Sequence, residues 1–145
     1  MPTTIYEYKT YNPYDVYLNS KGRDPTKNLP EKFQDFIFDA TPADFIKDQI
    51  SAPLILNENQ SQELAKIVLE LILADIYLGN IVQEIKNRLK ITDDQKAKTI
   101  AGLIVNGLFA PILEELKKMH IEKFAKNLPK TPQQDDRIID LKNNV

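Results

Sequence analysis

Apolar side chains in the middle of the chain recur with the period of an α-helix. They stand at i, i+3, i+4, i+7 and i+8, which is the spacing of one buried helical face: Leu64, Ile67, Val68, Leu71 and Ile72. Further apolar positions at Ala65, Leu69, Leu73 and Ile76 widen that face almost all the way round. The pattern predicts a central helix over residues 58–78, with Gly79 as its left-handed C-terminal cap.

A second apolar run predicts another central helix, over residues 93–110. Thr92 begins a capping signature in which Gln95 takes the third helical position. Residues 100–113 are apolar on nearly every side, as expected for a helix in a core. Pro111 lacks a backbone N–H and clashes with the preceding turn, so we expect a kink or break there.

Shorter amphipathic stretches surround these two helices. One begins near Glu31, and the next begins where Thr41 can cap a helix with Pro42 in its first position. Pro53 is predicted to separate that helix from the central one. Residues 80–90 and 112–127 supply two more helical stretches. The fold class is therefore predicted as all-α, a bundle of about five helices.

The composition divides the chain into three parts. Residues 1–30 hold five of the six tyrosines and four of the nine prolines without a consistent period, which predicts an extended tyrosine-rich N-terminal arm. Residues 31–128 carry the helical domain. Residues 129–145 are polar and contain two prolines, which predicts a flexible C-terminal tail.

Residues 54–76 resemble residues 89–112, with an offset of 35 at the cap and 36 in the helix. Each segment has a short apolar lead, a polar cap ending in glutamine, and a helix with alanine at two matched positions. Those alanines are Ala65, Ala74, Ala101 and Ala110. A duplicated helical unit explains the likeness, and so does convergence of two capped, buried helices. In either case the alanines permit close helix packing.

Part of this region resembles a known kind of module. The resemblance is carried by the run from Leu89 through Gln95, by Ala97, and by the segment 104–112 that ends Leu-Phe-Ala-Pro-Ile. Residues 54–116 are similar to a compact helical module of short, uncharacterised bacterial proteins. The resemblance implies a helical fold and no particular activity.

Several classes of protein are excluded by composition. The chain has no cysteine and one histidine, which excludes a disulfide framework, thiolate metal sites and the HExxH metalloproteases. Four glycines leave little material for a phosphate-binding loop. The N-terminus lacks the features of a signal peptide, and charges or prolines interrupt the apolar runs, so we expect a cytoplasmic protein with no membrane span.

The residues that could carry catalysis form no recognisable constellation. His120 lies among lysines, and a catalytic role would need an orienting carboxylate and a nearby nucleophile. We expect a surface or boundary histidine instead. Adjacent acids such as Asp93 and Asp94 do not share a helix face, and negative charge is favoured in a first helical turn. We predict no enzyme, and no catalytic, cofactor-binding or metal-binding residues.

Two clusters of basic residues, around residues 86–98 and 117–130, suggest a possible surface for nucleic acid. The net charge of −2 and the lack of aromatic residues between these lysines argue against it. Basic residues near helix C-termini are also commonly explained by the helix dipole. A small nucleic-acid-binding accessory protein therefore remains the alternative function.

The tyrosines of the arm are the most unusual feature, because tyrosine is enriched at protein interfaces. An apolar cluster in the tail could add to the edge of a partner's sheet. The predicted partner-binding residues are Tyr6, Tyr8, Tyr11, Tyr14, Tyr17, Ile138, Ile139 and Leu141. The arm could equally wrap its own domain, and the tail could be a frayed end. We expect a non-enzymatic structural or interaction subunit of a larger assembly, with a protein partner or a second copy.

Overall fold

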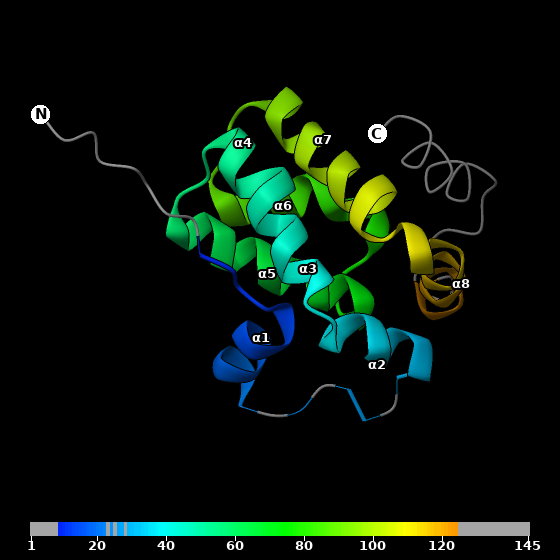
Figure 1. The fold of residues 1–145 in the computed structure, drawn as a ribbon. Helices are drawn as coiled ribbons and strands as arrows, with labels where there is room; N and C mark the ends of the chain where they lie inside the picture. Colours follow the sequence, from blue (N-terminus) through cyan, green and yellow to red (C-terminus); the bar gives the residue numbers. More distant parts are fainter. Residues whose placement is uncertain (1–8, 23, 25, 28, 125–145) are drawn as a thin grey trace, which may run out of the picture.

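The computed structural model describes residues 9–22, 24, 26–27 and 29–124, and over these residues it holds helices and no strands (Figure 1). The predicted all-α class is confirmed, with more helical segments than the five expected. The predicted tail lies outside the described residues.

The N-terminal part that the structure describes is helical. In α1 (Pro13–Lys21), the Asn12 side chain accepts hydrogen bonds from the first turn, and Gly22 ends the helix at a φ of +72°. Helix α1 packs along the central helix and buries Tyr17. The extended arm is therefore the wrong description of residues 13–21, because an asparagine–proline start and a buried face make a helix there.

The next helices supply one wall of the core. Helix α2 (Glu31–Phe38) buries Phe33 and Ile37. Helix α3 (Thr41–Phe45) begins where the Asp39 carboxylate accepts from both the backbone N–H and the hydroxyl of Thr41, at 3.0 and 2.9 Å. The predicted cap, Thr41, is instead the first residue of the helix, and the N-cap position falls on Ala40.

Pro53 does not separate two helices. Helix α3 continues through a π-helical segment, η1 (Ile46–Ser51), into α4 (Ala52–Leu54), and Pro53 lies inside α4. A proline ring clashes with the carbonyl four residues earlier in a regular α-helix, and the wider π turn relieves that clash. The helix ends instead at Ile55, which adopts a φ of +56°.

The central helix, α5 (Glu58–Ile72), starts with the capping box of Asn57 and Gln60. It ends earlier than residue 78, because Ala74 takes a φ of +58° and the Asp75 N–H closes the end on the Glu70 carbonyl at 2.8 Å. The prediction of Gly79 as a left-handed cap is wrong. Gly79 lies in a 3₁₀ turn, η2 (Leu78–Asn80), that leads into α6 (Ile81–Leu89).

Helix α7 (Asp94–Gly102) begins one residue later than its sequence signature suggested. Its cap is Asp93, whose carboxylate accepts from the N–H groups of Gln95 and Lys96 at 2.9 and 3.4 Å. Gln95 therefore occupies the second helical position. A π-helical segment, η3 (Leu103–Leu108), continues α7.

The predicted break at Pro111 is confirmed. The chain leaves η3 through a 3₁₀ turn, η4 (Ala110–Ile112), and then forms α8 (Leu113–Phe124). The stretches Asp94–Leu108 and Ala110–Phe124 are bent by 60° relative to each other, with the break just before Pro111. Among the described residues no single helix is long and apolar enough to cross a membrane; only this bent pair passes that test, taken together.

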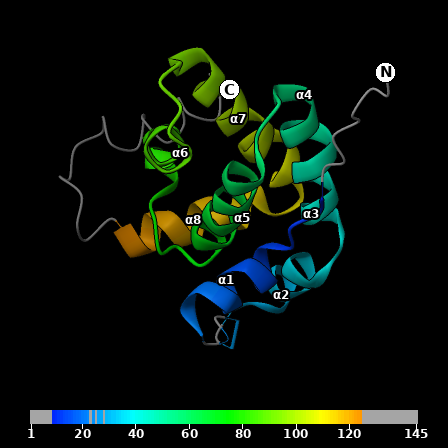
Figure 2. The same cartoon turned by 90° about the vertical axis from the view of Figure 1, so that its left-hand side faces the viewer.

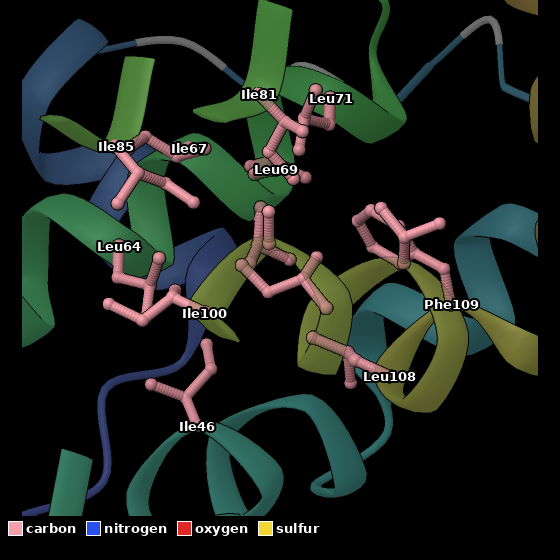
Figure 3. Close-up of a cluster of buried hydrophobic side chains, with 14 of the residues drawn as sticks. Ile46, Leu64, Ile67, Leu69, Leu71, Ile81, Ile85, Ile100, Leu108 and Phe109 are labelled. Carbon is pink, nitrogen blue, oxygen red and sulfur yellow. The ribbon is translucent and has the colours of Figure 1, made fainter. Parts of the chain in front are cut away.

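The core forms around α5 (Figures 2 and 3). Figure 3 shows Leu64 and Ile67 of α5 beside Ile85 of α6, with Ile100 of α7 close by. All four side chains are fully buried. The predicted burial of α5 on most sides is thus confirmed, and it follows from α1, η1 and α6 packing against different faces of that helix.

The two similar segments share the geometry of their turns. Ile55 and Lys90, 35 positions apart, adopt φ values of +56° and +57°. In both turns the next N–H donates five residues back, from Leu56 to Ser51 at 2.9 Å and from Ile91 to Lys86 at 3.0 Å. The likeness lies in the turn, because α5 starts with a capping box that α7 lacks, and α7 becomes π-helical where α5 stays regular. Of the matched alanines, Ala65, Ala74 and Ala101 are buried and Ala110 is exposed.

Replacing Lys90 with glycine is expected to raise the free energy of unfolding by up to about 1 kcal/mol, because a side chain is disfavoured in the left-handed region. Lys90 is exposed, so little packing is lost. Urea denaturation of both proteins measures the change. The matched control is Asp35→Gly in the interior of α2, where glycine is expected to destabilise; a Lys90→Gly protein as weakened as that control would contradict the prediction.

Candidate functional site

The structure places the three described tyrosines of the N-terminal region against the protein's own helices. Tyr17 is 1% exposed, and its hydroxyl donates to the Asp75 carboxylate at 3.1 Å. The Tyr11 hydroxyl donates to Glu58 at 2.7 Å, and the Tyr14 ring lies 4.8 Å from that of Phe38.

Tyr17 is therefore a core residue, and its prediction as a partner contact is corrected. Tyr11 and Tyr14 are half-buried. The remaining predicted partner-binding residues lie outside the described residues: Tyr6, Tyr8, Ile138, Ile139 and Leu141.

His120 is fully buried, so the prediction of a surface or boundary histidine is wrong. Its Nδ1 accepts from the Leu78 N–H at 3.0 Å, and its Nε2–H donates to the Leu71 carbonyl at 2.6 Å. Burial, together with the nearby Lys123, lowers the pKa of His120 to about 4, although the hydrogen bond to the Leu71 carbonyl acts in the opposite direction. Both ring nitrogens are engaged by the backbone, so this histidine joins α8 to the end of α5.

Two basic residues of the first cluster, Lys86 and Arg88, form ion pairs within the protein. The Arg88 guanidinium binds the Glu70 carboxylate through two hydrogen bonds, of 2.7 and 2.9 Å, and its Nε lies 3.3 Å from Glu63. Lys86 forms an ion pair with Asp94. In the second cluster, the Lys123 ammonium donates to the Ala74 carbonyl at 2.6 Å. Several of the cations that suggested a nucleic-acid surface thus bind groups of the protein itself.

Two hollows adjoin each other on the face formed by α7–η3 and α3–η1. The larger, of about 670 Å³, is called here the lysine hollow. It is lined by Gln95, Lys98, Thr99, Gly102, Leu103, Asn106 and Gly107. The smaller, of about 230 Å³, is called the aspartate hollow and is lined by Thr41, Asp44, Phe45, Asp48 and Gln49.

The close approach of Phe45 to Gly107 joins the two hollows. A Cβ atom on Gly107 would lie only 2.7 Å from the Phe45 ring, so the contact needs a glycine. The sequence reasoning did not find this face, because its residues come from two distant segments. The available signal was the pair of glycines among polar residues on the outer side of a long apolar helix.

A third feature is the apolar turn, defined as residues 52–55 at the end of α4. Ala52 and Pro53 are exposed, Leu54 is half-buried, and Ile55 is 78% exposed. Ile55 also carries the positive φ described above, which is an outlier for a β-branched residue. The sequence reasoning missed this turn because Pro53 was interpreted only as a separator.

Within the part of the chain that the structure describes, no group of three His, Cys, Asp or Glu side chains could hold a metal ion. No family model, no curated protein and no solved structure matches the chain. The residues that the structure describes therefore form a helical domain.

The stability of the protein is expected to fall between pH 7 and pH 4 because of His120. The unfolded histidine gains a proton near pH 6.5, whereas the folded one does so only near 4, so acid favours the unfolded state. The shift corresponds to about 3 kcal/mol lost by pH 4. Urea denaturation along a pH series measures this loss. In His120→Gln the slope between pH 7 and 5 should flatten, even if stability at pH 7 is lower; an unchanged slope would contradict the assignment.

Glu70→Gln is expected to lower the free energy of unfolding by about 2–3 kcal/mol, because it leaves the partly buried Arg88 without its two-point carboxylate partner. Glu84→Gln is the matched control. Glu84 lies 3.8 Å from the same guanidinium on the same helix, and its loss should cost no more than about 0.5 kcal/mol. Equal losses in the two variants, measured by urea denaturation, would refute the central role of Glu70.

Proposed function

We propose that this protein is a non-enzymatic interaction subunit of a larger assembly and that it contacts a partner protein through the apolar turn, residues 52–55. The observation that carries the proposal is Ile55, which combines a strained backbone with an exposed apolar side chain. The tail residues Ile138, Ile139 and Leu141 stay predicted as further contacts.

The backbone argument concerns the cost of the left-handed region. A residue with a Cβ atom is disfavoured there by about 1–2 kcal/mol, and a branched residue is disfavoured most. Glycine or asparagine would end helix α4 with less strain. The protein therefore keeps isoleucine at a position where its own stability favours another residue, which is typical of a side chain retained for function.

The side-chain argument concerns burial. Ile55 gains little from the fold, because most of its surface faces solvent. Ala52 and Pro53 extend the apolar surface next to it, and Leu54 contributes its exposed part. Burying an isoleucine side chain of this kind against a partner is worth about 1.5–3 kcal/mol. The turn is thus suited to fill a small apolar pocket of another protein.

The nucleic-acid alternative has less support. Its strongest binding group, the Arg88 guanidinium, faces the Glu70 and Glu63 carboxylates, and Lys86 pairs with Asp94. A cation already paired with a carboxylate contributes little to phosphate binding, because its partner must first be displaced. We therefore place the interaction on the apolar turn.

The test uses a photo-crosslinking residue in place of Ala52 in the full-length protein, made in the cells that normally produce it. We expect a defined crosslinked partner, which is lost when Ile55→Asn is added. The same Ile55→Asn change should raise the free energy of unfolding by about 1 kcal/mol, because asparagine tolerates the left-handed region. Loss of binding in a more stable protein cannot be attributed to unfolding.

Ile55→Val is the matched variant, since it keeps a branched apolar side chain at the same position. It should retain both the crosslink and the strain. A crosslinking residue at Glu122, exposed on α8, controls for chance encounters. The proposal fails if the Ile55→Asn protein crosslinks as the wild type does, or if position 122 captures the same partner.

A further inference from the structure

The chain that leads into α1 is held next to the apolar turn. The Tyr11 hydroxyl donates to the Glu58 carboxylate at 2.7 Å, and the Lys9 ammonium lies 3.9 Å from the same carboxylate. Glu58 is the first residue of α5 and follows Ile55 by three positions. In Figures 1 and 2 the described chain before α1 accordingly runs towards the side of the protein where α4 ends and α5 begins. Residues 1–8 are therefore attached to the described structure beside the apolar turn.

The segment of residues 1–8 is long enough to reach that turn. Eight extended residues span at most about 26–29 Å, and the three residues from Ile55 to Glu58 span at most about 11 Å. The turn stays within reach even after the two side chains of the Lys9–Glu58 contact are added. A tether this short raises the local concentration of the segment to about the millimolar range, so that even a weak contact is populated.

The composition of the segment matches the chemistry of the turn. Only one of its eight side chains is charged. Its apolar and aromatic residues are Met1, Ile5, Tyr6 and Tyr8. The turn offers apolar surface in return, with Ile55 78% exposed, and contact between apolar surfaces in water is favourable roughly in proportion to the area buried. From the attachment, the reach and the composition we infer that residues 1–8 cover the apolar turn of their own chain.

The covering segment regulates how strongly the turn binds another protein, a consequence that rests on the function proposed above. A partner binds only those molecules in which the turn is uncovered, so its apparent affinity falls in proportion to the uncovered fraction. A segment that covers the turn in about nine of ten molecules weakens the partner about tenfold. Residues 1–8 thus act as an internal competitor of the partner protein.

The intrachain contact is tested on the purified full-length protein, without a partner. A photo-crosslinking residue replaces Ala52, and mass spectrometry after digestion identifies what it captures. We expect crosslinks to residues 1–8 whose yield does not change with protein concentration, because the contact lies within one chain. The same crosslinking residue at Glu122, exposed on α8, should capture the segment at a yield at least about fivefold lower.

Two variants of equal length and charge distinguish an apolar contact from chance collision of a tethered segment. Ile5→Asp with Tyr6→Asp keeps the tether and removes two apolar side chains, so the crosslink yield at position 52 should fall about fivefold or more. Thr3→Asp with Thr4→Asp adds the same charges at polar positions and should crosslink as the wild type does. Thermal unfolding checks that both variants stay folded.

The inference is overturned if position 52 captures residues 1–8 no better than position 122 does, or if the two variants crosslink alike. In the cells of the earlier test, Ile5→Asp with Tyr6→Asp should raise the yield of the partner crosslink about threefold or more. A lower yield would mean that the segment itself binds the partner, which overturns its role as a competitor.

The two proposals fail on different outcomes. An intrachain crosslink without any captured partner refutes the proposed function and leaves the covering segment in place. A captured partner without an intrachain crosslink refutes the covering segment and leaves the proposed function in place.

Discussion

The fold depends on satisfying the polar groups in the C-terminal half of α5, where residues 67–72 are all buried. Helix α5 is buried along most of its length, and a buried carboxylate or free carbonyl is costly unless it is hydrogen-bonded. Three basic side chains from other elements meet this need at its C-terminal half. Arg88 binds the Glu70 carboxylate, His120 donates to the Leu71 carbonyl, and Lys123 donates to the Ala74 carbonyl. The negative end of the helix dipole favours the charged groups among them.

These same contacts explain why the basic residues and the histidine serve structure here. Arg88 ties α6 to α5, while His120 and Lys123 tie α8 to it. The neutral form of His120 is required, because its Nδ1 must accept a hydrogen bond from Leu78. The histidine and the basic residues, whose residue types suggested catalysis or nucleic-acid binding, thus hold helices together.

Structural features that do not stabilise the fold lie at the surface. A chain with four glycines places Ile55, Ala74 and Lys90 at positive φ, and of these only Ile55 is both branched and apolar. The proposed partner contact rests on the apolar turn around Ile55, which is both exposed and strained.

Periodicity and capping residues were sufficient for much of the fold. The amphipathic spacing in 64–72 predicted α5, the apolar run in 100–113 predicted a second core helix, and Pro111 predicted the bend before α8. These features are local, because hydrogen bonds and side chains within a few residues produce them. The position of a helix end was less predictable, since Ala74 rather than Gly79 adopts the left-handed conformation.

The sequence by itself determined the all-α class, the buried helices and the absence of cysteine chemistry, because these follow from composition and from short-range spacing. Only the tertiary structure decided the roles of individual polar residues. Tyr17 became a core residue because Asp75, 58 positions away, accepts its hydroxyl. His120 is buried between backbone groups of Leu78 and Leu71, which lie 42 and 49 residues earlier in the chain. Such pairings depend on how the helices pack in three dimensions. The periodic pattern of residues along the sequence therefore does not predict them.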